Sequence, residues 1–229
     1  MHIDLIKYLS DRAYEKVNKT EPGPVITISR EYGCPSKLIA CKLAEELSHM
    51  SLMKGRDKKW KYVTKEIMAE SARALQIEPE RIKYVFDYEQ KGLMDNVLLA
   101  LFDKYYKSDR KIRNTIAKVI RNMANEGHVI IVGRGGVAIT RDVALSLHIM
   151  LEAPLEWRAA RISENYKISL HEARKAARDI DIKRKEFREY FKGKNTDYTR
   201  FDITLNCMTL SIEEIVRIIA EIANIRKLV

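Results

Sequence analysis

Short apolar runs alternate with longer amphipathic segments along most of the chain. The runs VITIS (25–29) and VIIV (129–132) are mostly apolar, and apolar residues also make up the larger part of 143–150 and 201–207. A shorter strand is predicted over WKYV (60–63). Because nearly continuous apolar strands are typical of parallel sheets that are buried on both faces, the pattern predicts an α/β fold.

The segments between these strands show helical spacing. In 36–49, for example, apolar residues recur three and four positions apart, and Ser211 followed by Glu214 has the spacing of a capping box. A basic loop is predicted over 51–59. The predicted helices are 1–20, 36–49, 66–75, much of 78–126, a helix that begins over 154–163, 169–192 and 210–226.

Composition narrows the class of protein. The 229 residues carry a formal charge of +10, with seven Lys or Arg against one acid in 104–121 and thirteen against eight in 156–200. Such an excess attracts phosphate groups, on nucleotides or on nucleic acid. No apolar run is long enough to span a bilayer, and the charged N-terminus has no signal-peptide pattern. Three cysteines fit no disulfide framework or metal spacing, which indicates a reducing, cytoplasmic location.

Two glycine-bearing loops follow predicted strands, 30–37 and 133–136. Ligands of parallel sheets bind at the carboxyl ends of the strands, so both loops are candidate sites. The first has the layout of a phosphate-binding loop, in which Gly33 admits a phosphate and Ser36 and Lys37 stand at the helix start. It lacks the letters G-K-[ST], and Pro35 removes one amide donor. An ordinary strand–helix turn is the alternative at this point.

Six segments, in this order, resemble the cytidylate kinase-like family, a branch of the P-loop nucleoside monophosphate kinases: ITISREYG, WKYVTKEI, VIIVGRGG, LHIMLEAPLEWRAARI, DIDIKR and FDITLNCMTLSIEEIVRII. The resemblance covers about residues 25–219. It implies a three-layer P-loop NTPase-type fold with a five-stranded parallel sheet. It also implies an ATP site at the first loop, with Mg²⁺ bound to the nucleotide. We expect a single domain over 23–229 after an N-terminal extension (1–22), with a helical acceptor-side insertion (50–126) and an arginine-rich lid (158–198).

The resemblance also implies roles for individual residues of the two glycine-bearing loops. Lys37 stands where the family carries a phosphate-holding arginine, and Leu38 stands where ordinary monophosphate kinases place a threonine that binds Mg²⁺. Arg134 matches the arginine of a G-R-D turn that holds the acceptor nucleotide, while Gly135 replaces the aspartate. The nature of the acceptor base is therefore open.

In the lid, the segment D-x-x-R matches Asp181 and Arg184, and Arg178 lies one residue from the position of a further family arginine, here Ala177. The predicted catalytic residues are Lys37, Arg178, Asp181 and Arg184. The residues predicted to bind ATP and its phosphates are Arg30, Gly33, Ser36, Lys37, Arg158 and Arg161, and those predicted to bind the acceptor are Tyr32, Arg134, Gly135, Asp181 and Arg184. No protein metal ligand is predicted.

The resemblance implies an ATP-dependent phosphotransferase, with CMP, dCMP or another small phosphate-bearing molecule as acceptor. The departures at Pro35, Leu38 and Gly135 favour an alternative, a catalytically inactive nucleotide- or polyanion-binding protein on the same fold. Nucleic-acid binding through 104–121 ranks last, because no groove-reading motif accompanies the charge. No membrane partner is expected, and a homo-oligomer is left open.

Overall fold

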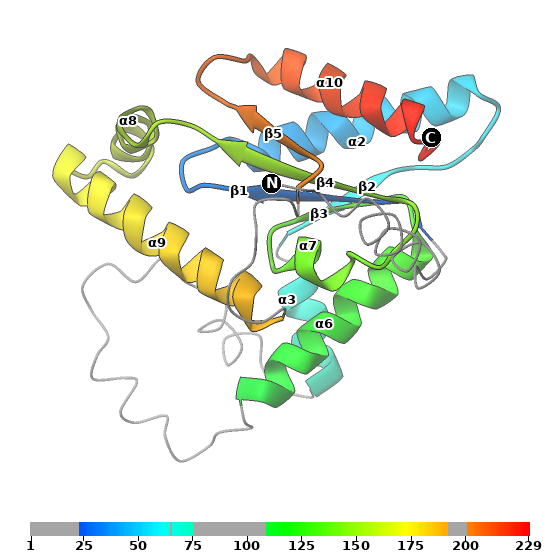
Figure 1. The fold of residues 1–229 in the computed structure, drawn as a ribbon, viewed down its shortest axis with the longest axis horizontal. Coiled ribbons are helices and arrows are strands. Elements are labelled where there is room, and N and C mark those ends of the chain that lie inside the picture. The colour runs from blue at the N-terminus through cyan, green and yellow to red at the C-terminus, as the bar shows by residue number, and fades with distance from the viewer. Residues whose placement is uncertain (1–22, 65, 76–108, 192–200) are drawn as a thin grey trace, which may run out of the picture.

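A computed structural model describes residues 23–64, 66–75, 109–191 and 201–229. Figure 1 shows a central sheet with helices on both sides. The strands are β1 (Val25–Arg30), β2 (Lys61–Val63), β3 (Val129–Val132), β4 (Ser146–Glu152) and β5 (Ile203–Asn206). The helices are α2 (Ser36–Met53), α3 (Glu66–Leu75), α6 (Asp109–Glu126), α7 (Gly136–Ile139), α8 (Leu155–Tyr166), α9 (Leu170–Tyr190) and α10 (Ile212–Ile225).

The five strands form one sheet in the order β2-β3-β1-β4-β5, and every neighbouring pair is parallel. The central strand β1 is paired along its length with β4, from Val25 opposite Ser146 to Arg30 opposite Leu151. On its other side, Ile28 lies opposite Val132. The predicted α/β fold with a five-stranded parallel sheet is therefore confirmed.

Both faces of the sheet are covered, which explains the nearly unbroken apolar strands. Ile26 and Ile28 pack with α2 and α10 on one face, whereas Val25 packs with α3 and α6 on the other (Figure 1). Alternate residues of a strand point to opposite faces, so a strand covered on both sides needs apolar residues at successive positions. Each of these three side chains is fully buried.

The helices α8 and α9 lie beyond the carboxyl ends of the strands (Figure 1). They pack on each other and on the loop after β1 through a third cluster of buried residues: Tyr32, Ala159, Ile162, Ala173, Ala177 and Ile180. A capping box formed by Ser169 and Glu172 fixes the start of α9. The capping box predicted for Ser211 and Glu214 is confirmed at the start of α10.

Predicted boundaries are wrong by a few residues at α2 and β4, and one short helix was missed. The helix α2 continues to Met53, so the predicted loop over 51–59 is shorter than expected. The strand β4 begins at Ser146 rather than at residue 143, because Val143 instead closes a turn in which its amide donates to Thr140 O. The one-turn helix α7 was not predicted. The predicted helix over 1–20, the part of 78–126 before residue 109 and the end of the lid (192–198) lie outside the described residues.

Within the described ranges, none of the helices combines the length and the apolar character needed to cross a membrane.

Candidate functional site

The candidate site lies at the carboxyl edge of the sheet, where β1 and β3 end side by side. The helix that follows β1, α2, packs on one face of the sheet, and the helix that follows β3, α7, lies on the other (Figure 1). Connections that leave neighbouring strands toward opposite faces mark a switch point of the sheet, where ligands of parallel sheets bind. The loops 31–35 and 133–135 both lie at this switch point.

The first loop leads directly into the amino end of α2. The Cys34 amide donates to Glu31 O (3.3 Å) and the Ser36 amide to Cys34 O (2.8 Å), which makes a tight turn before the helix. The cap residue, Pro35, offers no side-chain hydrogen bond, and no acid lies in the first turn. Among the described residues, the amides of Lys37 and Leu38 have no backbone acceptor. The start of α2 is thus open to an anion.

Gly33 allows this loop to lie close to α8. Its φ of +97° is in the left-handed region, and a Cβ at this position would come within 2.9 Å of Arg158 Cβ. Ser36 is 7% exposed, whereas Lys37 is exposed to solvent. Burial alone raises the pKa of the Glu66 carboxyl, but hydrogen bonds from Thr64 and the charge of Lys37 bring it below its usual value. The Lys37 ammonium therefore acts in the space between the loop and α3.

Arg158, predicted to bind phosphate, is 5% exposed and lies behind the loop. Its guanidinium forms ion pairs with Glu31 (3.2 Å) and Asp181 (2.9 Å). It also donates to Ala153 O (2.8 Å) and Tyr32 O (3.0 Å). All four of these partners are groups of the protein itself. Arg158 therefore fixes the first loop to the end of β4 and to α9, and we call this set of contacts the brace. Burial raises the pKa of the Glu31 carboxyl, against the opposing effects of the Ala153 amide and Arg158.

The lid helix α9 touches the first loop through two predicted residues. Asp181 Oδ1 accepts a hydrogen bond from the Tyr32 amide (2.7 Å), and Arg184 donates to Arg30 O (3.2 Å). The Arg184 guanidinium also lies over the Tyr32 ring, 5.4 Å from its centre. Arg161, from α8, stacks on Trp157 (4.8 Å) and approaches Gly33 O (3.4 Å). Lid and loop are therefore in direct contact.

Arg178, which was also predicted to be catalytic, does not take part in the contact between lid and loop. It is exposed on α9, and its charge acts on Glu156 of α8. Its neighbour Ala177, at the position of the family arginine, is fully buried between the helices and Tyr32. Adjacent residues point about 100° apart on a helix, so Arg178 cannot take the direction of residue 177 without rotating α9.

The second loop has three successive residues with positive φ: Gly133 (72°), Arg134 (56°) and Gly135 (72°). A left-handed arginine costs roughly 1–2 kcal/mol, and such strain is often found at functional sites. The Arg30 side chain lies against Gly133, in space that a Cβ would fill, and so joins the two loops. A Cβ at Gly135 would meet the ring of Phe191 at 3.1 Å. The end of α9 thus occupies space next to the position of the family's aspartate.

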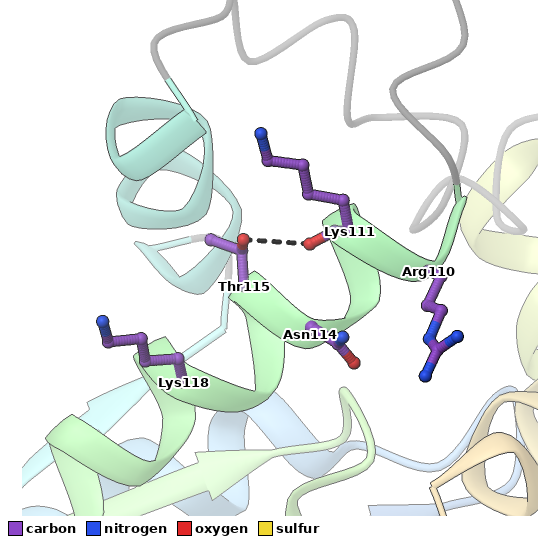
Figure 2. Close-up of a pocket in the computed structure, with 5 residues that line it drawn as sticks. All are labelled: Arg110, Lys111, Asn114, Thr115 and Lys118. Carbon is purple, nitrogen blue, oxygen red and sulfur yellow. Dashed lines mark hydrogen bonds between the residues drawn. The ribbon is translucent and has the colours of Figure 1, made fainter.

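A pocket of about 320 Å³ lies on α6, lined by Arg110, Lys111, Asn114, Thr115 and Lys118. Figure 2 shows these side chains along the helix, with Thr115 Oγ1 donating to Lys111 O (2.9 Å). In the part of the chain that the structure describes, Arg110, Lys111 and Lys118 form no ion pair. Three of the seven basic residues that the sequence places in 104–121 therefore line this hollow, whereas Arg113 lies over the Tyr190 ring and Arg121 pairs with Asp142.

Sequence reasoning missed the ion pairs around Arg158 and the packing of two cysteines into one buried cluster. Arg158 meets Glu31 across 127 positions of the chain, and no local pattern marks such a pair. Cys34, in the first loop, packs against the same buried cluster to which Cys207, directly after β5, belongs. The position of Cys34 at a helix start was the only signal in the sequence.

Comparison with solved structures gives relatives of low sequence identity. An uncharacterized protein from Eubacterium ventriosum is 19% identical, with a TM-score of 0.61 over 89% of this chain and 99% of the other. A shikimate kinase from Bacteroides thetaiotaomicron is 13% identical (TM-score 0.49; 87% and 98% covered). A dephospho-CoA kinase from Campylobacter jejuni is 15% identical (TM-score 0.35; 88% and 98% covered). The first of these supports the fold alone.

No curated protein matches the chain. The model of the cytidylate kinase-like family matches residues 25–209, which include both loops, the described part of the lid and all five strands. The chain belongs to the cytidylate kinase-like family.

Proposed function

We propose that this protein is an ATP-dependent phosphotransferase of the nucleoside monophosphate kinase type. The observation that carries the proposal is the contact of Asp181 and Arg184, on the lid helix, with the backbone of the loop that opens α2. Phosphoryl transfer requires positioning and positive charge more than covalent chemistry from the protein. An arginine held beside the loop that leads into an open helix start meets both requirements, since its planar fork can grip two phosphate oxygens.

The first loop fits a triphosphate. The free amides of Lys37 and Leu38 and the exposed Lys37 ammonium would hold phosphate oxygens, and Gly33 keeps the approach open. Leu38 offers no oxygen to a metal, and the described residues contain no group of three acidic, His or Cys side chains able to hold one. Mg²⁺ would therefore arrive with the nucleotide and neutralise phosphate charge there.

For the acceptor, Arg134 and Tyr32 are the proposed contacts, and a phosphate monoester such as CMP or dCMP is the first class to test. Arg134 follows β3 in a strained conformation beside the first loop. Gly135 brings no carboxylate to the acceptor, so recognition of a cytosine or sugar would rest on other groups. Lid closure over both substrates would exclude water and limit ATP hydrolysis.

The test is calorimetric titration of the protein with ATP and Mg²⁺, followed by a transfer assay with CMP, dCMP and other phosphate acceptors. We expect saturable micromolar binding that Lys37→Ala weakens at least tenfold. Lys42→Ala is the matched control: it removes a lysine from the same helix, paired with Glu213 away from the loop. If millimolar ATP gives neither heat nor thermal stabilisation, the kinase proposal is wrong.

The second candidate function is polyanion binding without catalysis. It is favoured by three cations around the α6 pocket that form no ion pair with the residues the structure describes, and by the departures at Pro35 and Leu38. Binding of this kind depends steeply on salt, because each phosphate contact releases counterions. Tight binding of inorganic tripolyphosphate that survives Lys37→Ala but is lost on the double substitution K111E/K118E would support it. Transfer to a nucleotide acceptor would contradict it.

A further inference from the structure

Arg30, at the end of β1, turns its side chain toward the second loop. Its backbone is the last position of β1 that pairs with β4, opposite Leu151, so the residue is held by the sheet. Its guanidinium lies on the other side of β1, against Gly133, which directly follows β3. The Nη1, Cζ and Nη2 atoms of Arg30 are the nearest ones to the place that a Cβ of Gly133 would take, with Cζ at 3.0 Å and Nη2 at 3.6 Å. Arg30 is half-buried in this position.

The first loop leaves β1 in the other direction, toward β4 and α8. The Glu31 carboxylate accepts a hydrogen bond from the Ala153 amide (3.0 Å), which follows β4. Gly33 then lies against Arg158 of α8. The amides at the start of α2, which would hold the triphosphate, come after this turn. The Arg30 side chain therefore turns away from the loop proposed to bind ATP.

Arg30 also lies beside two other arginines of the candidate site. Arg134 is the second residue after Val132 and Arg30 the second after Ile28, and Ile28 and Val132 form the last pair of β1 and β3. From the lid, Arg184 donates to Arg30 O (3.2 Å). Arg30 is thus in contact with the second loop through its side chain and with the lid through its carbonyl.

Phosphoryl transfer needs the acceptor in line with the phosphate that is transferred, so the two substrates occupy neighbouring places. A cation that is next to the ATP loop but turned away from it is placed for the acceptor. We propose that Arg30 binds the phosphate of the acceptor, together with Arg134 and Arg184, and does not bind ATP. A guanidinium suits a phosphate monoester because its planar fork holds two oxygens at once. The inference rests on the proposed function, since it requires a second substrate that carries a phosphate.

Gly133 belongs to the same arrangement, because the lack of a side chain leaves room for the Arg30 guanidinium. The Gly133 amide donates to Ile28 O (2.9 Å), so the second loop is fixed to β1. An alanine at residue 133 would therefore displace the end of the flexible Arg30 side chain rather than the loop. The substitution moves the guanidinium without removing its charge.

The experiment is calorimetric titration of the full chain with CMP and, separately, with ATP and Mg²⁺, followed by transfer kinetics. We expect Arg30→Met to weaken CMP binding and raise the KM for CMP by roughly tenfold or more, as loss of a charge-assisted hydrogen bond does. ATP affinity should stay within about twofold of the unmodified protein. Arg30→Lys should recover part of the CMP affinity, because it keeps the charge but not the fork. Arg217→Met is the matched control, since Arg217 is exposed on α10, and it should change neither affinity.

A double-mutant cycle tests the contact with Gly133. Gly133→Ala should weaken CMP binding in the unmodified protein and have little further effect in the Arg30→Met background. The strain of an alanine at positive φ is present in both backgrounds and cancels in the cycle. Additive effects of the two substitutions would overturn the inference. Gly133→Ala and Arg30→Lys keep the test valid should Arg30→Met fail to fold.

The outcomes separate this inference from the kinase proposal. If Arg30→Met weakens ATP binding as much as CMP binding, Arg30 serves ATP and the inference is wrong. It is also wrong if the unmodified protein binds none of CMP, AMP, GMP and UMP, or if transfer proceeds with an unchanged KM in Arg30→Met. If CMP binding depends on Arg30 but no phosphate is transferred, the inference stands and the kinase proposal fails.

Discussion

Replacing Arg158 with methionine separates a structural role for this residue from direct phosphate binding. The guanidinium is 5% exposed and makes ion pairs with Glu31 and Asp181, in addition to donating to two backbone carbonyls. Methionine fills much of the same volume but leaves both carboxylates and both carbonyls without this partner. The variant therefore tests whether the brace holds the loop.

The expected cost follows from the burial of the pair. Removing one partner of a buried ion pair typically costs about 3–5 kcal/mol. The carboxylate side chains are 29% and 23% exposed, so water can solvate them in part, and we expect the lower end, about 3 kcal/mol. For a chain of this size, that loss lowers the melting temperature by roughly 6–12 °C.

The assay is thermal unfolding followed by circular dichroism, with and without ATP. Arg174→Met is the matched control, because Arg174 also forms an ion pair, with Glu156 (2.7 Å), but at the surface of the lid. We expect no resolvable shift for that variant. If Arg158→Met has the same melting temperature as the unmodified protein and loses only ATP affinity, Arg158 is a phosphate ligand and the brace interpretation is refuted.

Three further predictions concern the lid, the loop and pH. Arg184→Ala should lower phosphoryl transfer by about 100–1,000-fold while leaving ATP affinity nearly unchanged in calorimetry; loss of ATP binding would contradict the lid assignment. Gly33→Ala should cost about 1–3 kcal/mol more than Gly55→Ala in urea unfolding, because both have positive φ but only Gly33 lies against backbone and Cβ atoms. Glu31 has a raised pKa and Glu214 a lowered one, the latter through hydrogen bonds at its helix cap. As pH rises above about 4.5, the unmodified protein should therefore lose stability relative to Glu31→Gln. Relative to Glu214→Gln, it should gain stability as pH rises toward about 4.5 and keep that gain above it, measured as urea midpoints. A change of the same sign in both comparisons would refute this.

The sequence alone determined the elements whose signals are local. The apolar run of β1, its glycine-bearing loop and the spacing in α2 predicted a strand, a turn and a helix in that order. The capping box at Ser211 could also be predicted from the sequence, since the two residues that form it are only three positions apart. The apolar strands also predicted a parallel sheet, because only strands covered on both faces need apolar residues at successive positions.

The tertiary structure decided which side chains meet. Arg158 was expected to bind phosphate and is buried behind the loop, while Arg178 lies on the outer face of α9 because Ala177 occupies the inner one. Cys34 packs against the cluster that contains Cys207 only because β5 lies beside β4 in the sheet. Such contacts join residues far apart in the chain, and they depend on strand order and helix rotation. Periodicity fixes neither, because it records which residues are buried and not what they are buried against.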